Sequence, residues 1–346
     1  MTPFRIADCT IGAGKAFLIA EIAQTHDGSL GLAHAFIDAA AEARADAIKF
    51  QTHIAAAEST LDEQFRVKFS KQDATRYEYW KRMEFTPEQW AGLAAHAAER
   101  KIVFLSSAFS LAAVALLQNI GMPAWKVGSG EVASTDLVGA MAATGKPVLL
   151  SSGMSTYAEI GAAVQQVRAA KAPVGVFQCT TKYPTPLAEV GLNVIDELRR
   201  RFDCPVGLSD HSGRPHPGLA AMARGADMIE VHFALSRSMF GPDVPVSLEP
   251  NELRLLADAR DAFAEMDAHP VDNDAAAGKL AAMRALFTKS LAPAKALAKG
   301  TVLSADMLTT KKPGTGVPPS ELPSLVGRRL KNAVGPDRLL RREDLE

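Results

Sequence analysis

The feature that most constrains this sequence is an alternation of short apolar runs with longer amphipathic runs, from Phe17 to about Ala264. Each short run is rich in apolar, strand-forming residues and is followed by a polar or Gly/Ser-containing turn. The eight runs are Phe17–Ala23, Ala47–Gln51, Val103–Phe109, Ala124–Ser129, Pro147–Gly153, Val174–Thr181, Val206–His211 and Met228–Phe233. Strands buried on both faces read as continuous apolar runs, so the pattern predicts an α/β fold of eight βα units, a (β/α)₈ TIM barrel.

The segments between these runs carry the helical signal. Apolar residues recur at spacings of three and four most clearly in Leu30–Arg44, Pro87–Arg100, Tyr157–Ala169 and Glu249–Phe263. A barrel of this kind takes about 250 residues, whereas the chain has 346. We therefore expect a barrel domain over residues 1–265 and a smaller domain after it.

The remainder of the chain differs in character from the barrel. Residues 266–288 include the Ala- and Asp-rich tract Asp267–Gly278 and are predicted to be a linker or a frayed helix. Residues 289–346 contain short runs separated by turn signals such as Lys299-Gly300 and Pro313–Gly316. This composition predicts a compact, turn-rich β module.

One connection within the barrel is unusually long. The polar and aromatic stretch Thr52–Phe85 separates the second predicted strand from its helix. Long connections in compact domains often form part of a site, although a surface excursion is as good an interpretation for any single residue.

Composition excludes several classes of partner. The formal net charge is −1, and no block of like charge is long enough for a nucleic-acid arm or a polybasic anchor. No stretch approaches the roughly 20 apolar residues of a membrane span, and the amino terminus lacks a signal-peptide pattern. Cys9, Cys179 and Cys204 are scattered without a CxxC pair. We expect a soluble cytoplasmic protein with small-molecule partners.

Two histidines lie at the ends of neighbouring predicted strands. His211 ends the seventh strand and His232 lies near the end of the eighth, so both imidazoles face the mouth of a barrel. Neutral imidazole suits Mn, Fe, Co or Zn, and two nitrogens leave positions open for water and substrate. A single histidine more often packs without a metal, but the pair predicts a catalytic metal site.

Two lysines stand inside apolar strands. Burial of Lys49 and Lys126 is costly unless an anion compensates, and a phosphate-bearing substrate is the simplest such anion. Hydroxyls at four strand ends can complete a phosphate cradle. They belong to Ser107, Ser129, Ser151 and Ser209. Pairing with a barrel carboxylate is the alternative for each lysine, and strand termination is the alternative for each serine.

Carboxylates occur at the same mouth. Glu21, Glu131, Asp210 and Glu230 lie at or near strand ends, where they can transfer protons or recognise hydroxyls. Salt bridges to the two lysines are the competing interpretation. The residues alone thus predict a metal-assisted barrel enzyme that acts on a phosphorylated or enol-phosphate substrate.

Several short motifs, in order along the chain, resemble those of the N-acetylneuraminate synthase family, which also makes legionaminic and pseudaminic acids. In the barrel they are Ile19–Ile22 (IAEI), Asp46–Gln51 (DAIKFQ), Lys126–Glu131 (KVGSGE), Leu150–Met154 (LSSGM), Gln178–Pro184 (QCTTKYP), Gly207–His211 (GLSDH), Glu230–Phe233 (EVHF), Gly241–Asp243 (GPD) and Ser247–Pro250 (SLEP). In the tail, Lys289–Leu291, Lys299-Gly300, Lys312–Gly316 and Leu325–Gly327 resemble the antifreeze-like (SAF) domain that ends these synthases.

The resemblance implies roles for individual residues. Phosphoenolpyruvate would bind Lys49, Ser107, Lys126, Ser129, Ser151, Thr181 and Ser209, and an N-acetylated hexosamine would face Gln51, Glu131, Tyr183 and Asp243. His211 and His232 would hold a divalent metal, with Mn²⁺ expected and Mg²⁺ or Co²⁺ as alternatives. The implied reaction joins the enol carbon to the open-chain aldehyde and then releases phosphate, with Glu21 as base or electrostatic stabiliser.

The resemblance also implies a domain-swapped homodimer in which the tail of one subunit covers the barrel of its partner. Three positions depart from the family pattern. Lys312 stands where the pattern has Arg, so a bidentate contact to an acetamido group becomes a point-charge contact. Val244 replaces His and Val231 replaces Lys, so the acceptor sugar need not be N-acetylmannosamine.

Three functional alternatives remain open. Within the family, the acceptor is N-acetylmannosamine or a 2,4-diacetamido-6-deoxy hexose. A more distant alternative is an ulosonic acid synthase that uses a sugar phosphate, which the tail and the Gly128–Glu131 motif disfavour. The third is a catalytically retired barrel that only binds carbohydrate, against which the two histidines and two lysines argue.

Overall fold

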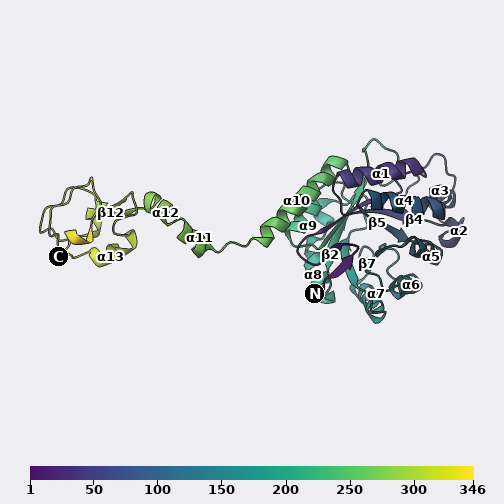
Figure 1. Ribbon diagram of the computed structural model, residues 1–346, viewed down its shortest axis with the longest axis horizontal. Coiled ribbons are helices and arrows are strands. Elements are labelled where there is room, and N and C mark those ends of the chain that lie inside the picture. The colour runs from purple at the N-terminus through teal and green to yellow at the C-terminus, as the bar shows by residue number, and fades with distance from the viewer. The chain divides into compact units, whose positions relative to one another are not determined.

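The computed structural model describes residues 1–346. Its contacts divide the chain into two compact units, Met1–Ala268 and His269–Glu346, and each is described by itself. Figure 1 labels the helices and strands of both units. None of the helices is both long and apolar enough to cross a membrane.

The first unit is a closed barrel of parallel strands. Its eight strands are β3 (Phe17–Ala23), β4 (Ala47–Thr52), β5 (Val103–Ala108), β6 (Trp125–Val127), β7 (Val148–Ser151), β8 (Val174–Cys179), β9 (Val206–Asp210) and β10 (Met228–Phe233). They pair in chain order, and β10 pairs with both β3 and β9, which closes the ring. A two-residue strand, β11 (Ser247–Leu248), adds to β10. The predicted barrel is confirmed.

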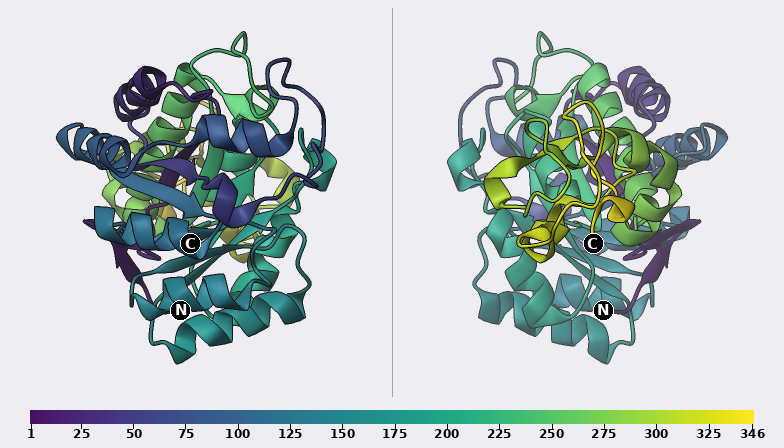
Figure 2. Two further views of the ribbon diagram at one scale, coloured as in Figure 1. Left: turned by 90° about the vertical axis from the view of Figure 1, so that its right-hand side faces the viewer. Right: turned by 90° about the vertical axis from the view of Figure 1, so that its left-hand side faces the viewer.

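Helices surround these strands, as Figure 2 shows. The helices that follow successive strands are α1 (Leu30–Glu42), α4 (Pro87–Glu99), α5 (Leu111–Ile120), α6 (Thr135–Ala143), α7 (Tyr157–Ala169), α8 (Leu192–Phe202), α9 (His216–Ala223) and α10 (Pro250–Ala268). Their start points are encoded locally: Ser29 caps α1, and Thr86 and Thr156 form capping boxes at α4 and α7. Short 3₁₀ turns lie at Leu187–Glu189 and Val244–Val246.

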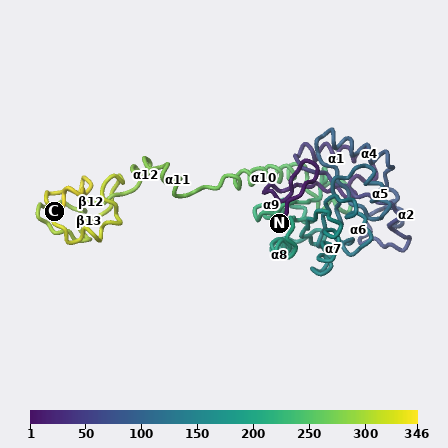
Figure 3. The backbone as a smooth tube through the Cα atoms, turned by 60° about the horizontal axis from the view of Figure 1, so that its bottom comes forward, coloured from purple at the N-terminus to yellow at the C-terminus, as the bar shows by residue number.

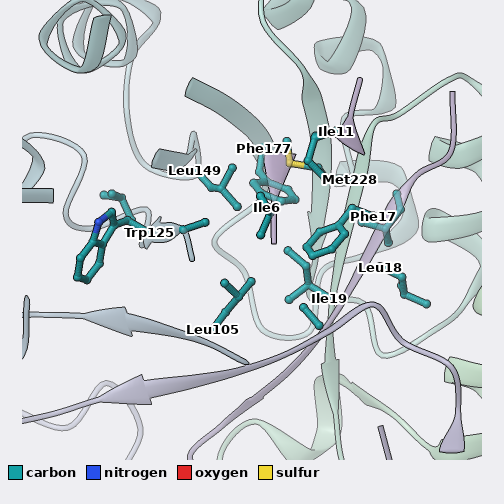
Figure 4. Close-up of a cluster of buried hydrophobic side chains, with 14 of the residues drawn as sticks. Ile6, Ile11, Phe17, Leu18, Ile19, Leu105, Trp125, Leu149, Phe177 and Met228 are labelled. Atoms are coloured by element: carbon teal, nitrogen blue, oxygen red, sulfur yellow. The ribbon is translucent and has the colours of Figure 1, made fainter. Parts of the chain in front are cut away.

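A small hairpin precedes the barrel and packs into its core. Strands β1 (Phe4–Ile6) and β2 (Cys9–Ile11) are antiparallel, and Ile6 and Ile11 are fully buried. Figure 4 draws both isoleucines in the same cluster as Phe177 and Met228 of the barrel strands. The chain terminus lies beside the end of α8, where the Met1 amino group is 2.6 Å from Asp203 (Figure 3). The hairpin therefore covers the amino-terminal end of the barrel.

The long connection after β4 folds into a substructure of its own. It contains α2 (Ala55–Glu58) and α3 (Arg76–Met83), which bury Ala55, Tyr79, Trp80 and Met83 against one another. Arg82 ties α3 to the loop after β3, because its guanidinium donates to the carboxylates of Asp73 and Asp27. The insertion is thus anchored at the carboxyl ends of the barrel strands.

The second unit has its own small core. Helices α11 (Asn273–Lys279) and α12 (Ala281–Phe287) precede the antiparallel pair β12 (Ser290–Pro293) and β13 (Leu308–Lys311). Helix α13 (Leu322–Leu325) and 3₁₀ turns at Ala305–Met307, Pro319–Glu321 and Arg342–Asp344 complete it. Its buried apolar residues are Leu291, Leu297, Leu303, Leu308, Val317, Leu325, Leu330, Val334 and Leu340. Two short helices thus occupy much of the segment 266–288, and regular strand pairing in this unit is limited to β12 and β13.

Candidate active site

A polar cavity of about 350 Å³ lies at the carboxyl ends of the barrel strands. In (β/α)₈ barrels this is the end at which strand termini and loops converge. Most of the residues predicted from the sequence line it together, namely Glu21, Lys49, Gln51, Ser107, Lys126, Ser129, Glu131, Ser151, Tyr183, Ser209, His211 and His232. The structure therefore gathers them from all eight barrel strands or the loops that follow them.

The floor of the cavity is a buried chain of alternating charges. Lys49 Nζ lies 2.6 Å from Glu21 Oε2 and 3.8 Å from Glu230 Oε2. Lys126 Nζ lies 3.4 Å from Glu230 Oε1. The side chains of all four residues are at most 6% exposed. The alternative left open for each lysine, pairing with a barrel carboxylate, is therefore realised, and the burial of the two lysines does not by itself require a bound phosphate.

The shared environment shifts these groups in different directions. Burial raises the pKa of Glu21 to about 7, against the opposing effect of Lys49. Burial alone would also raise the pKa of Glu230, but Lys126 and Lys49 together hold it below its ordinary value. Burial lowers the pKa of Lys126, whereas Glu21 and Glu230 outweigh burial at Lys49 and raise its pKa. Glu21 is thus the carboxyl group poised to exchange a proton near neutral pH.

Hydroxyl groups surround the lysines. Lys126 Nζ donates to Ser151 Oγ at 2.6 Å, and Lys49 Nζ donates to Ser107 Oγ at 3.3 Å. Ser209 Oγ donates to Glu230 Oε1 at 3.2 Å. An anion that enters the cavity would therefore meet two ammonium groups and several hydroxyls within one pocket.

A glycine brings two further hydroxyls together. Ser129 Oγ and Thr181 Oγ1 are 3.1 Å apart, and both lie against Gly153. A Cβ at Gly153 would stand 2.3 Å from Ser129 Cβ and 2.4 Å from Thr181 Oγ1. This close approach requires glycine at position 153. Thr181 itself does not line the cavity, although its partner Ser129 does.

The two histidines present neutral rings to the cavity. Their ring centroids are 5.2 Å apart. His211 Nδ1 donates to the Thr180 carbonyl at 2.9 Å, which leaves Nε2 as an acceptor for the Tyr183 hydroxyl at 2.9 Å. Burial lowers the pKa of His211 to about 4. Burial, the neighbouring His211 side chain and the positive charges of Lys49 and Lys126 lower the pKa of His232 well below its usual value.

This pair fits a divalent metal in one respect and is incomplete in another. His232 Nδ1 is buried and has no hydrogen-bond partner in the protein. A buried ring nitrogen without a partner is expected where a metal or a ligand binds. The histidines are not part of any group of three His, Cys, Asp or Glu side chains arranged to hold a metal. The donor set therefore fits a metal whose other positions are filled by water and substrate.

Tyr183 lines the cavity next to the histidines, and Arg66 and Asp243 interact with it from outside the cavity lining. The Tyr183 ring stacks on His211 with centroids 4.1 Å apart, and the Arg66 guanidinium lies 4.5 Å above the Tyr183 ring. Burial raises the pKa of Asp243 to about 6, while the charges of Arg66 and Arg76 oppose that rise. Asp243 does not itself line the cavity.

Gln51 and Glu131 also line the cavity. Gln51 Nε2 donates to Glu21 Oε1 at 2.8 Å. Glu131 lies before α6 and accepts from Ser134 Oγ at 3.1 Å. The predicted residue Lys312 belongs to the second unit, where its Nζ lies 5.1 Å from the centroid of the Phe287 ring.

Several cavity residues were not predicted individually. The insertion after β4 contributes His53, Glu58, Glu63, Arg76 and Trp80, and Phe109 and Cys179 complete this group. His53 lies just beyond β4, so the strand-end argument used for His211 also applied to it. The other insertion residues carry no such signal, because only the folding of Thr52–Phe85 back over the strand ends brings them to the cavity.

Together these features define a (β/α)₈ barrel whose charged and polar groups gather at the carboxyl ends of its strands, as in barrel enzymes. A small domain follows it. A family model described as the NeuB family matches residues 36–270, and a SAF domain model matches residues 288–346. The chain belongs to the NeuB family, which confirms the resemblance found in the sequence.

Known relatives match nearly the whole chain. N,N'-diacetyllegionaminic acid synthase of Campylobacter jejuni is 32% identical over 94% of this chain and 99% of its own length. N-acetylneuraminate-9-phosphate synthase of Homo sapiens is 32% identical over 94% of this chain and 91% of its own. The solved N-acetylneuraminic acid synthetase of Leptospira borgpetersenii in complex with citrate has a TM-score of 0.72 and 28% identity, and covers 82% of this chain and 96% of its own.

Proposed function

We propose that this protein is a nonulosonic acid synthase that condenses phosphoenolpyruvate with an N-acetylated aminosugar and releases phosphate. The observation that carries the proposal is the gathering of Lys49, Lys126, Glu21 and the two histidines in one cavity of a NeuB-family barrel. The relatives bear the names of synthases of this product class.

The lysines can accept a second anion although each already has a carboxylate partner. The contacts of Glu230 with Lys126 and Lys49 are long, at 3.4 and 3.8 Å, so neither ammonium group is saturated by it. The serine hydroxyls supply the remaining donors.

The reaction proceeds in two stages. The enol carbon of phosphoenolpyruvate attacks the aldehyde carbon of the open-chain sugar, which forms a C–C bond, and the aldehyde oxygen takes up a proton. Water then adds to the resulting cationic carbon and loses a proton, and the tetrahedral intermediate collapses to a ketone with cleavage of the C–O bond to phosphate. Glu21 is the residue to receive the proton from that water.

His211 and His232 would hold the divalent metal, Mn²⁺ or alternatively Mg²⁺ or Co²⁺. When bound, the metal would polarise the aldehyde oxygen as a Lewis acid. The chain contributes to this by keeping both imidazoles neutral through burial and by orienting the His211 ring through the bond from its Nδ1–H to Thr180. The Tyr183 hydroxyl donates to His211 Nε2, so it would have to leave that nitrogen for a metal to bind there.

The acceptor would face Gln51, Glu131, Tyr183 and Asp243. N-acetylmannosamine and a 2,4-diacetamido-6-deoxy hexose both fit a site that offers amide, carboxylate and hydroxyl groups. One relative at 32% identity is named for a phosphorylated product. On sequence grounds, the SAF domain is evidence against a sugar-phosphate acceptor. This relative, however, matches 94% of the chain, so the presence of the SAF domain does not by itself exclude such an acceptor.

The test is phosphate release from phosphoenolpyruvate in the presence of Mn²⁺. The acceptors compared are N-acetylmannosamine, its 6-phosphate and the 2,4-diacetamido-6-deoxy hexoses that lead to legionaminic and to pseudaminic acid. The control reaction lacks sugar. Release that depends on one acceptor identifies the product class. Absence of release with every acceptor, in protein that binds Mn²⁺, would contradict the proposal and favour a barrel that only binds carbohydrate.

A further inference from the structure

The ring of His53, a histidine that lines the cavity, is stacked on both faces. Its ring lies between Trp80 and Phe109, with centroid distances of 3.8 and 4.5 Å and interplanar angles of 17° and 8°. The residue is 4% exposed. Both faces of the ring are therefore covered, and only its two nitrogens can interact with polar groups.

Both of these nitrogens face oxygen acceptors. Nδ1 pairs with Glu58 Oε1, whose other oxygen accepts from the Ile54 amide at 3.3 Å. Nε2 lies 3.3 Å from the side-chain oxygen of Gln51. Since an amide oxygen can only accept, Nε2 must carry a hydrogen.

The orientation of the Gln51 amide is fixed by independent contacts. Its Nε2 donates to Glu21 Oε1 at 2.8 Å, and its oxygen also faces Gln24 Nε2 at 3.4 Å. A flip of the amide would place its oxygen against the Glu21 carboxyl group and an N–H against the Gln24 amide N–H. The second N–H of Gln51 has no acceptor within the protein, and Gln51 lines the cavity.

We infer that His53 is a positioning residue: held by Glu58 and two aromatic rings, it fixes the Gln51 carboxamide so that its N–H groups face Glu21 and the cavity. Position 51 consequently offers the cavity a hydrogen-bond donor, which suits a hydroxyl or carbonyl oxygen of the acceptor sugar. His53 has no free polar atom of its own for a ligand and acts through Gln51. The kinetic test of this inference rests on the proposed function.

The kinetic test compares His53→Phe, which keeps the aromatic stack and loses the Nε2 donor, with His53→Gln, which can return an N–H to the same place. The KM for the acceptor is expected to rise about tenfold in His53→Phe, with partial recovery in His53→Gln and a KM for phosphoenolpyruvate within about twofold of wild type. The matched control is His96→Phe, because His96 bonds to His34 and Asp38 outside the cavity.

A double-mutant cycle separates positioning from general loosening of the site. If His53 acts through Gln51, His53→Phe adds less than about twofold to the acceptor KM in a Gln51→Ala background. Equal increases of both KM values, or additive effects of the two substitutions, would overturn the inference.

A spectroscopic arm keeps the inference testable without catalysis. If wild-type protein shows no acceptor-dependent phosphate release, the proposed function fails, and ¹⁵N NMR of the imidazole nitrogens still tests His53. The wild-type signals that are absent from the spectrum of His53→Gln belong to His53. They are expected to show that its Nε2 carries a hydrogen. An Nε2 without hydrogen would overturn the inference, and this measurement on wild type also decides the matter if His53→Phe does not fold.

Discussion

Glu21 combines a raised pKa with contacts to Lys49 and Gln51 at the floor of the cavity. Burial raises its pKa to about 7, so its carboxylate form becomes populated as the pH rises through neutrality. If it receives the proton of the attacking water, kcat rises over the same interval. Glu21→Gln is expected to remove this rise and to lower kcat by about 10²-fold or more. The measurement is kcat across about pH 5.5 to 8.5, and a rise retained in Glu21→Gln would assign it to another group.

Gly153 tests the packing of the hydroxyl pair. In Gly153→Ala the new methyl group must displace Ser129 and Thr181, which would otherwise lie 2.3 and 2.4 Å away. We expect the KM for phosphoenolpyruvate to rise about tenfold and the free energy of unfolding to fall by about 1–3 kcal/mol. The control is Gly31→Ala in α1, where a Cβ meets nothing within 4 Å. An unchanged KM for phosphoenolpyruvate in Gly153→Ala would show that Ser129 and Thr181 do not take part in its binding.

The pairing of the two buried lysines with carboxylates could not be predicted from the sequence. The sequence places Lys49 and Lys126 in buried strands correctly, and it also contains Glu21 and Glu230. The pairing depends on the register between neighbouring strands, which places Glu21 opposite Lys49. The sequence of a single strand does not determine that register. The burial of the lysines therefore does not by itself require phosphate, and the expectation of a phosphate-bearing substrate rests on the neighbouring hydroxyl groups and on the family membership.

At the scale of elements, the barrel strands could be predicted because continuous apolar runs are a strong signal. The predicted run Met228–Phe233 coincides with β10, and Val174–Thr181 exceeds β8 by only two residues. The hairpin β1–β2 was missed because strands of three residues are too short to establish a period. The folding of Thr52–Phe85 into α2 and α3 depends on contacts such as Arg82 to Asp27, which no local pattern reveals.

The hairpin provides a prediction about stability alone. Ile11→Ala removes a fully buried side chain at the amino-terminal end of the barrel. We expect a loss of about 2–5 kcal/mol in the free energy of unfolding, because the lost contacts leave a cavity in the core. Denaturant unfolding measures it, with exposed Thr10→Ala in the same strand as the control. A changed KM at unchanged stability would contradict the account of the hairpin as a core element.

At the scale of the whole molecule, the two compact units raise the question of how the tail takes part in catalysis. We propose an exchange of tails within a homodimer, which predicts complementation between inactive chains. Glu21→Gln impairs only the barrel and Lys312→Ala only the tail, so heterodimers would contain one intact site. Equimolar refolded mixtures are expected to recover about a quarter of wild-type activity. No recovery above either parent would contradict the exchange.

The central claim is that this barrel makes a C–C bond from phosphoenolpyruvate rather than merely cleaving its phosphate ester. ¹³C NMR of the reaction with [3-¹³C]phosphoenolpyruvate, Mn²⁺ and the preferred acceptor tests it most directly. The account predicts that the label becomes a methylene carbon bonded to the former aldehyde carbon of the sugar, at the rate at which phosphate is released. A label found only in the methyl group of pyruvate would show simple hydrolysis and contradict the synthase assignment.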